Sequence, residues 1–174
     1  MKNSFFFIGL VLLLGSCSEK RYISKAAKNQ DILLYGSVHD YSSGDPINNG
    51  KFILMRDGAE HFIGEIKNGK YAHFLDLDHT YRLEYLSDGH ISKYVIIDTQ
   101  NVPLDDRSAG FTMTIDITLI RPLEGVDYSF FENNPVGKAS YDHTVGNMFW
   151  DTKYNSKNDK TIAAIMKAHD EAAK

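Results

Sequence analysis

The strongest constraint on the fold is a run of alternating residues near the middle of the chain. Over residues 111–119, apolar side chains occupy every second position, and three threonines and one aspartate fill the positions between them. A period of two places one set of side chains in a core and the other in water, which is the pattern of a half-buried β-strand. The sequence therefore predicts a strand over residues 111–120.

Shorter apolar runs precede this strand at roughly ten-residue spacing, separated by turn signals such as Asp57-Gly58, Asn68-Gly69 and Asp88-Gly89. No long helical pattern lies between them, which argues against an α/β sheet. We expect an all-β, seven-stranded antiparallel β-sandwich of the immunoglobulin-like kind, with a core that includes the apolar side of residues 111–119. The other expected core residues are Phe52, Leu54, Tyr71, Leu75, Tyr81 and Leu83. The expected strands are 32–38, 51–56, 61–66, 71–75, 81–86, 91–97 and 111–120.

Local motifs in this region resemble the carboxypeptidase regulatory-like domains. A strand ends in a Gly-Ser-Val-His-Asp sequence at Asp40, and a Ser-Gly-Asp-Pro-Ile loop follows at residues 43–47. Further matching turns lie at residues 68–71, 80–83 and 88–90. The resemblance implies a prealbumin-like (transthyretin-like) sandwich over residues 32–98, with 109–120 supplying the last strand. It implies little about activity, because such modules are scaffolds for many functions.

The first sixteen residues predict a secretory signal peptide. Lys2 supplies a positive charge, and residues 5–14 form an apolar run of ten residues. A membrane-spanning helix needs about 20 residues, so this run is too short to be one.

The run ends in Leu14, Gly15 and Ser16, directly before Cys17, the only cysteine of the chain. This sequence resembles a bacterial lipobox. The resemblance implies that Cys17 carries a diacylglycerol, and that acyl chains such as palmitate hold the protein on a membrane. Ser18 follows the cysteine, which implies outer-membrane delivery and leaves open whether the protein faces the periplasm or the outside. The alternative is an ordinary signal peptide with a coincidental cysteine.

The predicted organisation is a signal peptide over 1–16, a lipidated cysteine with a polar tether over 17–30, a sandwich domain over 31–120 and a tail over 121–174. The tether is a solvated linker, or its basic residues attract anionic headgroups. The first part of the tail is rich in aromatic residues and has no strand rhythm, so we expect it to be irregular. Its segments 134–138 and 147–154 resemble those of small Bacteroidetes-type envelope lipoproteins. A helix is predicted at about 156–173, capped by Ser156 or Asn158, and it packs on the sandwich or frays.

The sequence offers no complete set of catalytic residues. The formal net charge is −4 with no basic block, which disfavours nucleic-acid binding. The histidines lack metal-ligand spacing, so no metal and no cofactor is expected. Calcium binding by oxygen-rich loops is an alternative. The candidate loops contain Asp76, Asp78 and His79, and Asp40 and Asp45, but neither has the usual calcium-loop motif. A transthyretin-like hydrolase is a further alternative, but the terminal signature of that family is missing.

These observations predict a non-enzymatic, lipid-anchored protein of the cell envelope that presents a protein-interaction or structural surface. The alternative is a glycan-binding accessory lipoprotein, because aromatic side chains stack on sugar rings. Either hypothesis places the ligand or partner contacts at Phe149, Trp150 and Tyr154. The glycan hypothesis requires Trp150 to be accessible.

Overall fold

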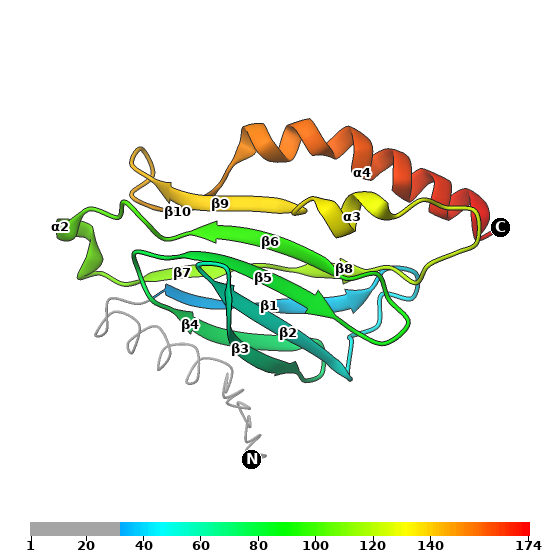
Figure 1. Ribbon diagram of the computed structural model, residues 1–174, viewed down its shortest axis with the longest axis horizontal. Coiled ribbons are helices and arrows are strands. Elements are labelled where there is room, and N and C mark those ends of the chain that lie inside the picture. The colour runs from blue at the N-terminus through cyan, green and yellow to red at the C-terminus, as the bar shows by residue number, and fades with distance from the viewer. Residues whose placement is uncertain (1–31) are drawn as a thin grey trace, which may run out of the picture.

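The computed structural model describes residues 32–174 and contains two β-sheets and a long C-terminal helix (Figure 1). The predicted signal peptide, the lipobox residues Leu14, Gly15 and Ser16, Cys17 and the tether lie outside the described residues. Within residues 32–174 no helix is both long enough and apolar enough to cross a membrane.

The first sheet has the order β4–β1–β7, and β8 also pairs with β1. Its strands are β1 (Ile32–Asp40), β4 (Lys70–Leu75), β7 (Phe111–Thr114) and β8 (Ile117–Leu119). The second sheet has the order β10–β9–β6–β5–β2–β3. Its strands are β2 (Gly50–Arg56), β3 (Ala59–Ile66), β5 (Thr80–Leu86), β6 (Lys93–Asp98), β9 (Gly137–Asp142) and β10 (Asn147–Trp150). The helices are α2 (Leu104–Arg107), α3 (Ser129–Asn133) and α4 (Thr152–Ala172).

The prediction of a mostly-β, two-sheet architecture with a C-terminal helix is confirmed, and its details need correction. Ten strands, not seven, lie in the described residues, because the tail supplies β9 and β10 and the predicted strand 111–120 is divided into β7 and β8. The sheets are mixed rather than antiparallel, since β1 runs parallel to β7 and β8, and β6 runs parallel to β9. Parallel neighbours need long crossover connections. The chain passes through β2 to β6 and α2 between β1 and β7, and through α2, β7, β8 and α3 between β6 and β9.

The predicted strand 111–120 is interrupted between β7 and β8. A Cβ atom on Gly36 would lie 1.9 Å from the carbonyl oxygen of Ile115, so the two backbones approach more closely there than any other residue would allow. The carboxylate of Asp116 takes over part of the pairing, because its Oδ1 accepts hydrogen bonds from the backbone N–H and the hydroxyl of Ser37. At this interruption the Asp116 side chain, rather than the backbone, therefore pairs with β1.

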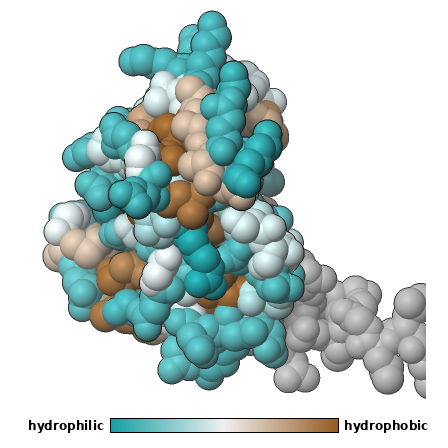
Figure 2. Space-filling model, turned by 90° about the vertical axis from the view of Figure 1, so that its right-hand side faces the viewer, coloured by the Kyte–Doolittle hydropathy of each residue, from teal (hydrophilic) through white to brown (hydrophobic). Residues whose placement is uncertain are grey.

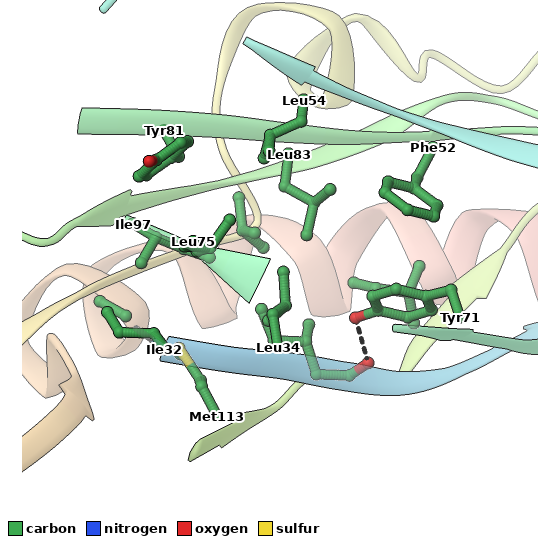
Figure 3. Close-up of a cluster of buried hydrophobic side chains, with 14 of the residues drawn as sticks. Ile32, Leu34, Phe52, Leu54, Tyr71, Leu75, Tyr81, Leu83, Ile97 and Met113 are labelled. Carbon is green, nitrogen blue, oxygen red and sulfur yellow. Dashed lines mark hydrogen bonds between the residues drawn. The ribbon is translucent and has the colours of Figure 1, made fainter. Parts of the chain in front are cut away.

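One cluster of buried side chains fills the space between the sheets (Figure 3). All six predicted core residues outside 111–119 are buried, as is the apolar side of that segment. The cluster contains one polar pair, in which the hydroxyls of Tyr71 and Tyr85 lie 2.6 Å apart. Tyr71 donates a further hydrogen bond to the carbonyl of Ile115, which anchors the interruption between β7 and β8 to the core.

The tail folds back over the second sheet instead of remaining irregular. Helix α4 begins at Thr152, four residues before the predicted start, because Asp151 rather than Ser156 or Asn158 caps it. The Asp151 side chain accepts the backbone N–H of Tyr154. The helix packs rather than frays, through Ile162, Ile165 and Met166 against a second buried cluster. That cluster comprises Ile120, Tyr128 and Phe131.

Candidate functional site

A groove of about 400 Å³ opens where the first sheet meets the tail. One wall is the interruption between β7 and β8, and the other walls are β6, the start of β9, the end of β10 and the first turn of α4; Figure 1 shows α4 running above β9. We call it the Trp150 groove. Its lining residues are Val95, Thr114, Ile115, Asp116, Ile117, Val136, Gly137, Trp150 and Asn155.

Trp150 is half-buried and lies partly against the main core and partly at the groove. Its indole ring rests against the backbone of Gly137, because a Cβ there would lie 2.8 Å from Cζ3 of the ring. Only a glycine leaves room for the ring in this position. The groove therefore has one aromatic wall whose place is fixed by the strand beneath it.

Two polar side chains of the groove have hydrogen-bonding capacity to spare. Asn155 has its Oδ1 atom buried with no hydrogen-bond partner among residues 32–174. Asp116 accepts both of its recorded hydrogen bonds at Oδ1, so within the same residues Oδ2 accepts none. Buried polar atoms in native proteins are nearly always paired, so the unpaired Oδ1 of Asn155 indicates a place where a ligand or water donates, whereas the exposed Oδ2 of Asp116 is accessible to either.

The other two predicted contact residues lie elsewhere. Phe149 is 45% exposed and points away from the Trp150 groove, into a second hollow of about 390 Å³ that Trp150 also borders. Tyr154 serves packing, since its hydroxyl donates to the carbonyl of Pro135 and Lys138 lies 4.4 Å above its ring. The structure thus brings only Trp150 of the three into the groove.

Three of the motifs that carry the family resemblance, at residues 36–40, 43–47 and 88–90, meet where β1 ends. Asp40 Oδ2 lies 2.9 Å from both Nε2 of His90 and Nε of Arg121, and its Oδ1 accepts the backbone N–H groups of Ser42 and Ser43. Figure 2 views this end, where hydrophilic side chains surround patches of hydrophobic ones.

These bonds satisfy the cluster internally. The backbone N–H of Ser43, followed by the side chains of His90 and Arg121, holds the pKa of Asp40 far below its usual range. The adjoining cavity of about 300 Å³ is lined largely by polar groups. We therefore interpret this cluster as a structural clamp that joins the loops after β1, β5 and β8.

The acidic loop around residues 76–79, considered above for calcium binding, forms ion pairs with other side chains instead. Asp76 pairs with Arg56, Asp78 forms a two-pronged contact with Arg107, and His79 lies 2.6 Å from Asp57. Over residues 32–174 no group of three or more metal-ligating side chains is placed to hold an ion.

Lys93 on β6 is a buried lysine without a carboxylate partner in the described part of the chain. Its Nζ donates to the carbonyl of Thr118 on β8 at 2.7 Å and lies 4.8 Å from the ring centre of Phe131. Burial lowers the pKa of Lys93 to about 8. The side chain links the two sheets at a cost in desolvation, and its position in an apolar run is the only local feature that marks it.

Comparison with known proteins yields structural neighbours only. The sequence matches no known protein family and no curated protein. One similar crystal structure is 3-chlorocatechol 1,2-dioxygenase from Rhodococcus opacus 1CP, at 11% identity and a TM-score of 0.40, covering 53% of this chain and 60% of that one. Another is a protein of unknown function, described as membrane-associated, from Bacteroides fragilis NCTC 9343, at 13% identity and a TM-score of 0.37, covering 55% and 30%. A third, described as carbohydrate-binding, is from Bacteroides uniformis ATCC 8492, at 15% identity and a TM-score of 0.36, covering 56% and 46%.

The chain spans between 30% and 60% of the length of these three proteins. Two of them come from Bacteroides and are compatible with an envelope module, but likeness at this level carries no argument about ligand or activity. The carboxypeptidase regulatory-like assignment remains a prediction, since no family matches.

The comparisons correct one prediction. The prediction that the chain is not an enzyme is wrong, because the fold gives no ground for it. Dioxygenases, including a catechol 1,2-dioxygenase from Acinetobacter, are among the similar structures. The likeness is equally no evidence for a dioxygenase reaction. Enzymes and binding proteins share such scaffolds, so only the chemistry of a site can decide between them.

Sequence reasoning missed Asp116 and Asn155 as groove residues. Asp116 has the position of an ordinary water-facing residue in an alternating strand, and Asn155 lies just before the predicted helix start. No local pattern marks either one, because their proximity depends on the parallel pairing of β1 with β7 and β8 and on the fold-back of the tail.

Proposed function

We propose that this chain is a lipid-anchored protein of the cell envelope that binds glycan chains in the Trp150 groove. The observation that carries the proposal is the Trp150 ring beside two acceptors with spare capacity, the Oδ2 of Asp116 and the Oδ1 of Asn155. A sugar ring offers an apolar face of C–H groups to an aromatic ring and hydroxyl donors at its edge. In the groove, the Trp150 ring matches the apolar face, and the oxygen atoms of Asp116 and Asn155 match the hydroxyl donors.

The shape of the groove supports a chain rather than a single small ligand. Trp150 borders the groove on one side and the hollow around Phe149 on the other, and the two cavities measure about 400 and 390 Å³. Both are open to solvent and fall in the size range of small-molecule sites. A linear oligosaccharide crossing Trp150 would occupy both.

The anchor rests on the lipobox-like sequence before Cys17. Two or three acyl chains hold a protein on a bilayer almost permanently, because each buried methylene contributes about 0.8 kcal/mol. The proposed arrangement places the groove close to the outer membrane, facing the periplasm or the outside.

The glycan proposal is tested by calorimetry with a panel of soluble oligosaccharides. We expect Trp150→Ala to weaken binding by at least about tenfold, since central aromatic contacts commonly dominate an interface. Phe62→Ala is the matched control, because it removes a 40% exposed aromatic side chain on β3 that lines neither cavity. Equal affinity of the wild type and Trp150→Ala, with both folded, would refute the role of the groove.

The anchor proposal is tested separately by fractionation and by mass spectrometry of the mature N-terminus. Wild-type protein should remain with the membrane and carry an acylated cysteine, and Cys17→Ser should be soluble. An unmodified N-terminus in the wild type would refute lipid anchoring and leave the glycan proposal standing.

A second candidate function is binding of a protein partner along β3. This strand lies at the edge of the second sheet, and Phe62 and Ile63 on it are 40% and 50% exposed. Edge strands can pair with an extended segment of another protein. Ile63→Lys should abolish capture of an envelope protein if this strand is the contact, and should have no effect on oligosaccharide binding.

A further inference from the structure

Asp116 is an exposed carboxylate in the lining of the Trp150 groove. Asp40, Asp76 and Asp78 each have an arginine as a partner in the structure. Asp116 is held only by the neutral Ser37. Within residues 32–174 it makes no ion pair.

The described lining of the groove contains no basic side chain that would neutralise the negative charge of Asp116. Asp116 is the only ionisable side chain among the groove-lining residues of the described chain. Two lysines on the adjoining strands are engaged elsewhere, since Lys93 donates to the carbonyl of Thr118 and Lys138 lies over the ring of Tyr154. The groove is therefore an anionic site with apolar walls.

The unpaired oxygen atoms of two lining side chains suit a ligand that donates hydrogen bonds. The free Oδ2 of Asp116 and the buried Oδ1 of Asn155 both accept and neither donates. An ammonium group brings three donors and a positive charge. A cation is also attracted to the face of an indole ring such as that of Trp150.

We propose that the preferred ligand is an oligosaccharide that contains amino sugars with free, protonated amines. The ammonium group would lie at Asp116 and the pyranose ring would pack on Trp150. This inference rests on the proposed glycan binding and specifies its substrate class. Chains of uronic acids would be rejected, because a second carboxylate near Asp116 is repelled and finds no cation in the lining.

The test compares four oligosaccharides of equal length by calorimetry: a free-amine glucosamine chain, its N-acetylated form, a neutral glucan and a uronic-acid chain. We expect the free-amine chain to bind about tenfold or more tightly than the acetylated one, because a charge-assisted bond replaces a neutral one. Added salt should reduce that preference.

Asp116→Asn provides the matching variant, because the amide oxygen can still accept from Ser37 while the charge is lost. It should lower affinity for the free-amine chain about tenfold and bring the ratio between the free-amine and acetylated chains close to one. Asp105→Asn is the control, because it removes the same charge from an exposed position on α2 outside the groove. Thermal unfolding of both variants verifies the fold.

The outcomes separate the two proposals. If the neutral or acetylated chain binds as tightly as the free-amine chain and Asp116→Asn leaves the ratio unchanged, the amine inference is overturned and glycan binding stands. If none of the four chains binds the folded protein, both are overturned.

Discussion

The indole ring of Trp150 lies directly against the backbone of Gly137, with Cζ3 only 2.8 Å from the position where a Cβ of residue 137 would be. Trp150 pairs with Ala139 across the β9–β10 hairpin, and Gly137 is the next residue on the same side of β9. The Trp150 ring can therefore occupy this position only because residue 137 on the neighbouring strand is a glycine and has no side chain.

The first prediction concerns Gly137→Ala. The added methyl group must displace the ring, and overpacking of this kind costs about 1–3 kcal/mol. We expect a lower free energy of unfolding in urea and weaker oligosaccharide binding. Gly125→Ala makes the same chemical change in a loop with no neighbour within 4 Å, although it adds backbone strain at a positive φ, so it should leave binding unaffected. Unchanged binding in Gly137→Ala would contradict the role assigned to this packing.

The second prediction concerns the clamp at Asp40. Replacing Asp40 with Asn removes a buried charge that four donors share, and breaking a buried pair of this kind costs about 3 kcal/mol at neutral pH. Asp45→Asn, which changes an exposed residue of the same pocket, should cost little. Urea unfolding at neutral pH measures both.

The same clamp predicts a dependence on acid. The pKa of Asp40 is depressed in the folded state, so its stabilisation is complete above the unfolded-state pKa of about 4 and is lost as the pH falls below that value. Wild-type protein should lose stability between about pH 5 and pH 2 more steeply than Asp40→Asn. Parallel pH profiles of the two proteins would contradict the prediction.

The third prediction concerns Lys93, whose pKa is lowered to about 8 by burial. Between this value and the unfolded-state pKa of about 10.4, the unfolded chain binds more protons than the folded one, so stability rises with pH. From about pH 7.5 to pH 9.5 the expected gain is about 2 kcal/mol. Lys93→Met should abolish the gain, while Lys138→Met, on the neighbouring strand, should retain it.

The fourth prediction concerns the docking of α4. The hydroxyl of Tyr128 lies 2.7 Å from Nδ1 of the buried His169, and Tyr128→Phe leaves that nitrogen without its partner. We expect a loss of about 1–3 kcal/mol and faster amide hydrogen exchange in the last turns of α4. Tyr41→Phe is the matched control, because the Tyr41 hydroxyl makes only a long, exposed contact with Asp170. Equal exchange in both variants would refute the buried bond as the anchor of the helix.

Local sequence was sufficient to find most strands and the core. The period-two pattern and the Asp-Gly and Asn-Gly turns depend on side-chain alternation and on backbone conformations at positive φ, which the structure has at Asp57, Asn68, Gly58 and Gly69. Such features act over a few residues, so they can be read along the chain. The C-terminal helix could be predicted for the same reason, because Ile162, Ile165, Met166 and His169 have the spacing i, i+3, i+4 and i+7 that places them on one helix face.

The conformation of the tail and the position of the groove depend on contacts between distant parts of the chain. Residues 137–150 become strands because β9 pairs with β6, more than forty residues earlier in the chain, and no short-range pattern specifies that partner. The interruption at Ile115 and Asp116 arises from the close approach of Gly36, nearly eighty residues away. Core residues and turns can be recognised from short stretches of sequence, because side-chain hydrophobicity and turn geometry are local properties. The groove beside Trp150 was decided by long-range pairing, since it combines residues that only the packed sheets and the folded-back tail bring together.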